Sequence, residues 1–399
     1  MSSFFRHGHA ADPGWRYATE VVLEQLDAQS REPGYAPGAN LGLIYVTEEL
    51  VDDLADIVGL LRERTGVQDW VGTIGHAIVA TGREYRNEPA ISVMLADLPA
   101  GSFHVFSGKQ RPPAPGTLTG SGAYAAYSAL VHADPTTPDL PELIHDMAGK
   151  VESGFVFGGL ASGSTIPLPQ VANQTLAGGL SGAVFSSEVE LRTRVTQGCT
   201  PLAAEHVISD CTSNLIRALD GQPALDVLLA DLGVEEPTRQ SRDGERIIQS
   251  LPADRLRRGL FVGLAPRGED RGIGFGDYRV RNLIGIDPQN RLVAVAAVPE
   301  AGDRAVFCTR DAQAARADLI RACTELREDL ESESLTIRGG LYVSCVARGQ
   351  ALFGALSAEI ELIAANLGRF PLVGFFANGE IARNNLYGYT GVLTLFVSR

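Results

Sequence analysis

The feature that most constrains the fold is a strand–helix–strand pattern that occurs three times along the chain. Each occurrence has two short apolar runs separated by an amphipathic stretch of helical period, and the three span residues 40–74, 125–160 and 340–376. Two strands joined by a helix normally lie parallel in one sheet. Between the second and third occurrences, residues 188–219 and 279–298 are typical of antiparallel strands. We therefore predict an α/β fold of mixed β-sheets with flanking helices.

The final strands of the second and third occurrences end in matching, glycine-rich tips. Without a gap, Gly158 aligns with Gly374, Ser162 with Asn378 and Gly163 with Gly379. His76, directly after Gly75, has a similar position in the first occurrence. We interpret the match as an internal duplication, with one copy in each of two related domains.

Two domains are also expected from length, because 399 residues are too many for one ordinary hydrophobic core. We place an N-terminal domain at 38–233 and a C-terminal domain at 250–399, with the polar segment 233–254 as the linker. Residues 1–37 are expected to form an extension with one helix, which begins at Asp12-Pro13.

Composition excludes several classes of function. The net charge is −14, with 48 acidic against 34 basic side chains and no basic stripe, so a nucleic-acid partner is not expected. No apolar stretch approaches the roughly 20 residues that span a bilayer, and the N-terminus lacks the apolar core of a secretion signal. Neither a membrane partner nor export is therefore expected. The five cysteines are scattered without a CxxC pair, which favours a reducing cytoplasm over a disulfide framework.

The sequence motifs predict no cofactor and no metal site. His7 and His9 lie in a terminus that we expect to be frayed, and the other histidines lack metal-ligand spacing. The glycine-rich segment 272–276 does not close a strand and open a helix, as a dinucleotide loop must, and we interpret it as a mobile loop. Neither a GxxxxGK[ST] phosphate loop nor a GxSxG nucleophile motif occurs.

The candidate ligand-binding residues gather after the strands of the third occurrence. Its first strand is followed by Cys345, Arg348 and Gly349, and its second by Asn378, Gly379 and Glu380. Loops at strand ends are where open α/β sheets bind ligands. The set is completed by the tip residue His76 and by two residues of a predicted hairpin, Arg281 and Asn282.

Several of these residues also have a purely structural interpretation, and both interpretations stay open. Arg348 and Glu380 could pair with each other or hold opposite ends of a zwitterion. Asn378 and Gly379 could form only a tight turn, since glycine allows a positive φ. Cys345 is a candidate nucleophile if Arg348 lowers its pKa, but a small buried thiol is the more frequent role at such a position.

These motifs resemble those of the FIST family, a sensory module of bacterial signal-transduction proteins and of some eukaryotic F-box proteins. In the C-terminal half the resemblance rests on residues 281–288, 310–311, 344–349 and 374–381. In the N-terminal half it rests on Gly158-Gly159, Gly178-Gly179 and residues 219–225. It covers the chain from about Asn40 to the end.

The resemblance implies a FIST N-terminal domain, a FIST C-terminal domain and a cytoplasmic sensor of a small ligand, with amino acids among the ligands proposed for the family. Family members often carry an output domain, for which we expect no room here, so the signal would pass to a signalling partner. Two alternatives stay open. One is an enzyme with Cys345 as nucleophile and His76 as a distant base, although we assign no catalytic residue. The other is an interaction scaffold, which a dry and filled cleft would favour.

Overall fold

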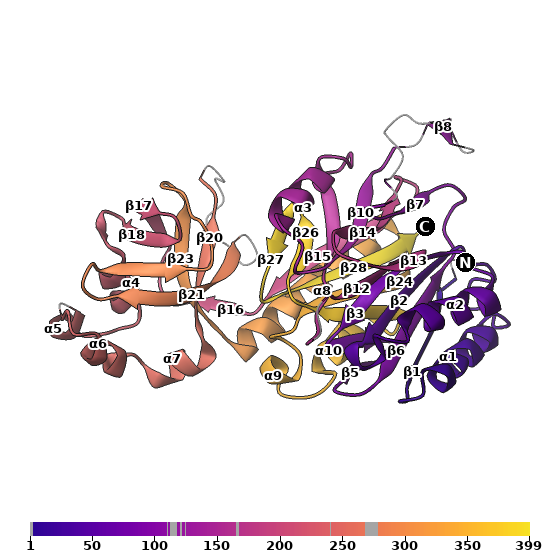
Figure 1. Ribbon diagram of the computed structural model, residues 1–399, viewed down its shortest axis with the longest axis horizontal. Helices are drawn as coiled ribbons and strands as arrows, with labels where there is room; N and C mark the ends of the chain where they lie inside the picture. The colour runs from indigo at the N-terminus through magenta and orange to yellow at the C-terminus, as the bar shows by residue number, and fades with distance from the viewer. Residues whose placement is uncertain are drawn as a thin grey trace. The chain divides into compact units, whose positions relative to one another are not determined.

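The computed structural model describes residues 3–109, 111, 118–119, 122–123, 125–164, 167–239, 241–267 and 278–399. The chain divides into two compact units (Figure 1). Unit 1 comprises Met1–Thr196 together with Leu319–Arg399, and unit 2 comprises Gln197–Asp318. The units do not follow the expected division at 38–233 and 250–399, because the C-terminal segment joins the N-terminal half in one unit. The α/β class with mixed sheets is confirmed.

Unit 1 is built from several helices and many strands. Its helices are α1 (Trp15–Gln29), α2 (Leu54–Thr65), α3 (Leu140–Ala148), α9 (Gln350–Phe353) and α10 (Ala358–Leu367), and α8 (Ala312–Glu333) includes the boundary with unit 2. Its strands are β1 (Arg6–Ala11), β2 (Leu41–Thr47), β3 (Asp69–Gly75), β4 (Ala77–Ala80), β5 (Arg83–Arg86), β6 (Ala90–Ala96), β7 (Phe103–Phe106), β8 (Leu118–Thr119), β9 (Gly122–Ala123), β10 (Ser128–Ala133), β11 (Phe155–Leu160), β12 (Pro169–Ala172), β13 (Gln174–Ala177), β14 (Leu180–Phe185), β15 (Leu191–Gln197), β24 (Thr336–Cys345), β25 (Leu372–Ala377), β26 (Glu380–Arg383), β27 (Asn385–Tyr387) and β28 (Thr390–Ser398).

All three strand–helix–strand occurrences lie within unit 1. The duplication, expected as one copy in each of two domains, is therefore a threefold repeat within one unit. Each repeat supplies one parallel strand pair, namely β2–β3, β10–β11 or β24–β25. A hairpin follows each pair, and the next strand returns antiparallel to the first strand of the pair. The three six-stranded sheets have the same order, which is β1-β6-β2-β3-β12-β13, β7-β14-β10-β11-β26-β27 and β15-β28-β24-β25-β4-β5.

The hairpins are exchanged among the repeats. The first repeat's hairpin, β4–β5, extends the sheet of the third repeat by pairing with β25. The second repeat's hairpin, β12–β13, extends the sheet of the first repeat through β3. The third repeat's hairpin, β26–β27, extends the sheet of the second repeat through β11. The exchange is therefore cyclic, and each sheet is completed by a segment distant in sequence.

One glycine recurs in the second parallel strand of every repeat. Gly72 lies opposite Ile44, Gly158 opposite Val131 and Gly374 opposite Tyr342. A Cβ atom at any of these glycines would overlap the carbonyl oxygen of the opposite residue. The close approach of the two strands thus requires glycine at this register position in all three repeats.

The sheets of unit 1 enclose one core and carry helices outside it. Inward-facing residues of all three sheets share one apolar cluster, which includes Tyr45, Phe157 and Phe375. The outward residues of β2 and β3 pack instead against α1 and α2, and those of β10 and β11 against α3. Helix α2 ends at Gly66, whose φ of 75° terminates the helix while its N–H donates to the Arg62 carbonyl.

Unit 2 is an antiparallel barrel with short helices. Its strands are β16 (Cys199–Pro201), β17 (His206–Thr212), β18 (Leu215–Leu219), β19 (Gln222–Pro223), β20 (Leu260–Ala265), β21 (Arg279–Asp287), β22 (Leu292–Val295) and β23 (Arg304–Arg310). Its helices are α4 (Ala224–Asp231), α5 (Glu236–Arg239), α6 (Gly244–Ser250) and α7 (Ala253–Arg258). Six strands close into a ring because β23 pairs with both β17 and β20.

Several sequence expectations need correction here. Residues 233–254 were expected to be a linker but contribute α5 and α6, with Ile247 buried in the core of unit 2, since short helices need few apolar residues. His7 and His9 lie in β1, which pairs with β6, and not in a frayed terminus. The expected mobile loop at 272–276 lies outside the described residues. In the part of the chain that is described, no helix has the length and apolar character needed to cross a bilayer.

Candidate functional site

The glycine-rich tips of β3, β11 and β25 converge at one edge of unit 1. The backbone N–H of His76 donates to Ser162 Oγ at 2.9 Å, and that hydroxyl donates to the carbonyl of Phe376. The N–H of Asn378 donates to the carbonyl of Leu160 at 3.1 Å. One tip from each repeat is therefore held against the others, and His76 lies beside the C-terminal motifs.

The exposed side of this edge carries a histidine–carboxylate pair. His76 Nδ1 lies 2.6 Å from Glu48 Oε1, and the imidazole side chain is 44% exposed. The second oxygen of Glu48 accepts from both the N–H and the hydroxyl of Ser164 at 2.6 Å. Burial raises the pKa of Glu48, but the hydrogen bonds from Ser164 and His76 outweigh it, so the pKa lies below its usual value. Glu48 therefore remains ionised and orients the ring.

Arg348 is fully buried, and its ion-pair partner is a residue that the sequence did not suggest. Its Nε donates to Glu359 Oε1 at 2.9 Å, and Glu359 comes from α10. The same carboxylate accepts from Tyr342 at 2.8 Å, from Ser344 at 3.1 Å and from the N–H of Gly349 at 3.0 Å. Four donors thus satisfy Glu359, which fixes the loop after β24 against the helix.

Two guanidinium groups of this region carry donors without hydrogen-bond acceptors. Both terminal nitrogens of Arg348 are buried and have no hydrogen-bond partner, and the guanidinium lies 5.2 Å from the centre of the Phe353 ring. Nε and Nη2 of Arg86, on β5, also have none, and Nε lies 3.9 Å from Glu84. Arg86 Nη2 approaches the position that a Cβ of Gly349 would take, at 2.8 Å. The structure therefore holds two cations near Gly349 with unused donor capacity, which is unusual for buried groups.

Glu380 is buried beside Cys345 on the other side of the same strand end. Its Oε2 accepts from the N–H of Thr390 at 3.0 Å and from its hydroxyl at 2.8 Å, while the neighbouring thiol of Cys345 donates to the carboxylate. Burial raises the pKa of Glu380 to about 7, although Thr390, Cys345 and the charge of Arg348 oppose the rise. Burial and the charge of Glu380 also raise the pKa of the Cys345 thiol, which disfavours the thiolate that a nucleophile needs.

The raised pKa of Glu380 predicts a stability that falls with rising pH. The folded protein keeps the carboxyl proton to about pH 7, whereas the unfolded chain releases it near 4.5, so the free energy of unfolding decreases between these values. This group contributes a decrease of up to about 3 kcal/mol. Because glutamine stays neutral, Glu380→Gln should match the wild type at pH 5 and exceed it at pH 8 in urea titrations.

A matched control separates this effect from any general response to charge removal. Glu361 is exposed on α10, so Glu361→Gln should retain the wild-type pH dependence. Glu84, whose pKa burial raises to about 7 against the charge of Arg86, should keep part of the slope in Glu380→Gln. An unchanged slope in Glu380→Gln would contradict the buried, protonated carboxyl.

The remaining predicted site residues divide into two groups. Asn378 is exposed, and Gly379 has a φ of 140° with its carbonyl accepting from the N–H of Leu160 at 2.8 Å, so the tight-turn interpretation fits both. Arg281 and Asn282 lie on β21 in unit 2, and their part in this site stays a prediction. The sequence analysis missed Glu84, Arg86 and Glu359. Among the described residues, no group of histidine, cysteine and acidic side chains is arranged to hold a metal ion.

Comparison with known proteins identifies the family. The model of the FIST N domain matches residues 40–222, and the model of the FIST C domain matches residues 224–383. The chain belongs to the FIST family. The boundary between the two FIST models falls inside unit 2, so each FIST half contributes to both compact units.

Mycobacterial relatives share almost the full length of this FIST protein. The uncharacterized protein Rv0628c of Mycobacterium tuberculosis is 28% identical over 389 residues, which cover 93% of this chain and 94% of the relative. The uncharacterized protein Mb0898c of Mycobacterium bovis is 28% identical over 402 residues, covering 95% of this chain and 96% of the relative. The sequence similarity thus extends along nearly the whole of both relatives.

Proposed function

We propose that this FIST protein is a sensor that binds a free amino acid at the strand-end cluster of unit 1 and signals through a partner protein. The observation that supports this most is the pair of unpartnered, fully buried terminal nitrogens of Arg348. A planar guanidinium whose two terminal nitrogens both have N–H groups without acceptors is suited to a carboxylate. Glu380, with one oxygen not committed to Thr390, would receive the ammonium group.

The charges of the cluster favour a zwitterion over a simple anion. Above pH 7, where both Glu84 and Glu380 lose their protons, the cluster contains two cations, Arg86 and Arg348, and three anions, Glu84, Glu359 and Glu380. An amino acid adds no net charge to this balance, whereas a simple carboxylate adds an uncompensated negative charge to a buried site. Protonating Glu380 would offset the added charge of the simple carboxylate but would remove the acceptor that an ammonium group needs.

Binding requires the cluster to open, because its charged side chains are buried. The short helix α9 contacts the cluster through Phe353, whose ring centre lies 5.2 Å from the Arg348 guanidinium, and the helix is bounded by Gly349 and Gly354, with φ values of 60° and 82°. Glycines in such conformations can absorb a hinge motion at low energetic cost. We propose that a ligand favours an open arrangement of residues 349–354, and that this change is what a partner detects.

The filled cluster also favours the interaction scaffold as a second candidate function. In this alternative Arg348 and Glu359 only hold the loop after β24 against α10, Glu380 only joins β26 to β28, and partner binding needs no small ligand. The two functions make opposite predictions for a ligand screen, so one experiment separates them.

A thermal-shift screen of the twenty amino acids at pH 8 tests the proposal. A ligand at about 100 times its Kd should add about 2.7 kcal/mol to the free energy of unfolding. Arg348→Lys, which keeps the charge but loses the planar fork, and Glu380→Gln should abolish the shift while the folded protein persists. Affinity should fall from pH 8 to pH 6 as Glu380 becomes protonated, and acetate should not reproduce the effect.

The control is Arg338→Lys, since Arg338 is a half-buried arginine of the same unit that binds the carbonyls of Ser3 and Asp97. It should shift with the same ligand as the wild type. A silent panel would favour the scaffold, and a shift that survives both Arg348→Lys and Glu380→Gln would place the ligand elsewhere.

A further inference from the structure

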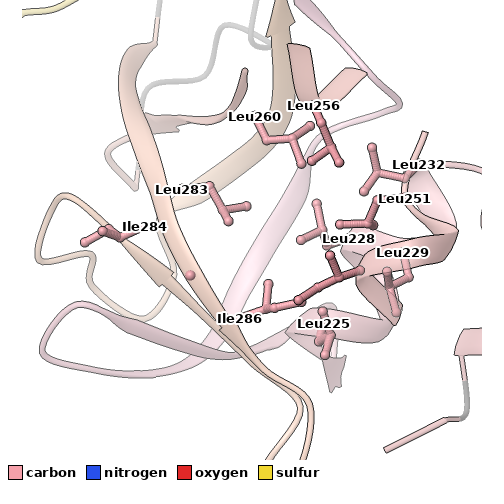
Figure 2. Close-up of a pocket in the computed structure, with 12 residues that line it drawn as sticks. Leu225, Leu228, Leu229, Leu232, Leu251, Leu256, Leu260, Leu283, Ile284 and Ile286 are labelled. Carbon is pink, nitrogen blue, oxygen red and sulfur yellow. The ribbon is translucent and has the colours of Figure 1, made fainter. Parts of the chain in front are cut away.

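Unit 2 contains a cavity that is separate from the strand-end cluster. It has a volume of about 300 Å³ and lies between the helices α4, α6 and α7 and the strands β20 and β21 (Figure 2). Leu225, Leu228, Leu229 and Leu232 line one wall, and their spacing places all four on one face of the α4 segment. The opposite wall is the stretch of β21 from Leu283 to Ile286.

The chemistry of the lining is uniform. All twelve lining residues are leucine, isoleucine or glycine, so no side chain offers a charge, a hydrogen-bond donor or an aromatic face. Three of them are large side chains left open to solvent, namely Ile248 at 56% exposure, Leu256 at 43% and Ile284 at 60%. Such a grouping of exposed apolar side chains around a concave site indicates that something apolar covers it.

The size and shape of the cavity restrict what that occupant can be. An engineered apolar cavity of about 150 Å³ holds one benzene molecule, so this cavity has room for about twice that volume. A purely aliphatic wall gives an aromatic ring no stacking partner, but it suits a flexible alkyl chain. With no polar side chain in the lining, a polar head group gains nothing inside and stays in water.

We infer that unit 2 binds the alkyl chain of a small amphiphile in this cavity, with the head group outside. Sequestering the chain removes apolar surface of both ligand and protein from water, which is the driving force. The head group does not determine affinity, so a carboxylate and an alcohol of equal chain length bind alike.

The test is calorimetric titration of the full-length protein with decanoate, decanol and benzene, each below the concentration at which it self-associates. We expect one saturable site for both decanoate and decanol, with similar affinity and a negative heat-capacity change. Gly285 lines the cavity, and a side chain there would meet no atom within 4 Å. Gly285→Leu should therefore fill the cavity and weaken both chains at least tenfold.

A second variant and a control distinguish a loss of binding at the cavity from a loss of binding caused by misfolding. Leu256→Ser changes a half-exposed rim residue and should also weaken binding at least tenfold. Val298→Phe adds bulk at a side chain of unit 2 that is 75% exposed and does not line the cavity, so it should bind as the wild type does.

Several results would overturn the inference. One is a lack of saturable binding by decanoate and decanol, and another is binding that both Gly285→Leu and Leu256→Ser leave intact. Binding of benzene without either chain compound would assign the cavity to a different ligand class. A wild-type protein that self-associates in sedimentation, with Leu256→Ser monomeric, would make this face an interface between copies of the chain.

Discussion

Gly158→Ala is expected to remove at least about 4 kcal/mol from the free energy of unfolding, which would leave little folded protein at 37 °C. Gly158 has a φ of 137°, a backbone conformation that L-residues rarely adopt, and an added Cβ would overlap the carbonyl oxygen of Val131 on the paired strand. Relief would require β10 and β11 to separate inside a buried parallel pair. The equivalent Gly374→Ala, with a φ of 156° and the Tyr342 carbonyl in the way, should be similarly severe.

The measurement is urea unfolding followed by circular dichroism, with soluble yield as a first indicator. Gly59→Ala is the matched control, because Gly59 lies exposed in α2 with no atom within 4 Å of an added Cβ. There the same substitution should stabilise the protein by about 0.5–1 kcal/mol through helix propensity. A loss of less than about 1 kcal/mol at Gly158 would mean that the strands can separate easily, contrary to the structure.

Arg348→Ala should cost about 3–5 kcal/mol, the next largest loss, because it leaves a buried carboxylate without its cation. Glu359 would keep its hydrogen bonds from Tyr342, Ser344 and Gly349 but would lose the only charge that the structure places in contact with it among the described residues. Removing both charges while keeping an acceptor, as in Arg348→Met with Glu359→Gln, should recover part of the loss, since no unpaired charge remains and the amide oxygen still accepts from the buried donors.

A double-mutant cycle in urea measures this coupling. The comparison is Arg64→Ala, which breaks a 2.9 Å ion pair with Glu20 on the exposed surface of the same unit. That change should cost less than about 1 kcal/mol. Additive effects of the Arg348 and Glu359 substitutions would show that the pair does not act as one unit.

The sequence was most informative where local pattern and tertiary role coincide. The apolar runs and helical stretches of the three repeats are evident from periodicity, and the glycine-rich tips after β11 and β25 can be matched directly. The exchange of hairpins among the repeats could not be predicted from the sequence. Strand pairing between β4 and β25 is fixed by contacts between segments about 300 residues apart, and neither segment carries a local signal for it.

In the candidate site, too, single residues could be predicted from the sequence but their partners could not. Arg348 and Glu380 could be singled out because they interrupt apolar strand ends, but their partners could not be assigned from spacing. Glu359 is one acidic residue in a helix with Glu361, and only the packing of α10 shows which of them is buried. Glu84 and Arg86 alternate on a short hairpin, where charges are ordinarily solvated, but β5 joins the third sheet, which buries Glu84 and leaves the Arg86 side chain only 16% exposed.

The cyclic exchange of hairpins has a consequence for how the protein is made. During synthesis, one edge of β11 stays unpaired until β26 has been translated. The β4–β5 hairpin likewise cannot pair with β25 until that strand has emerged near the end of translation. Incomplete chains therefore expose unpaired strand edges, which is the condition under which nascent proteins aggregate or need chaperones. Neither FIST half is consequently expected to fold on its own. The shortest fragment that can reach the native state of unit 1 is the nearly complete chain.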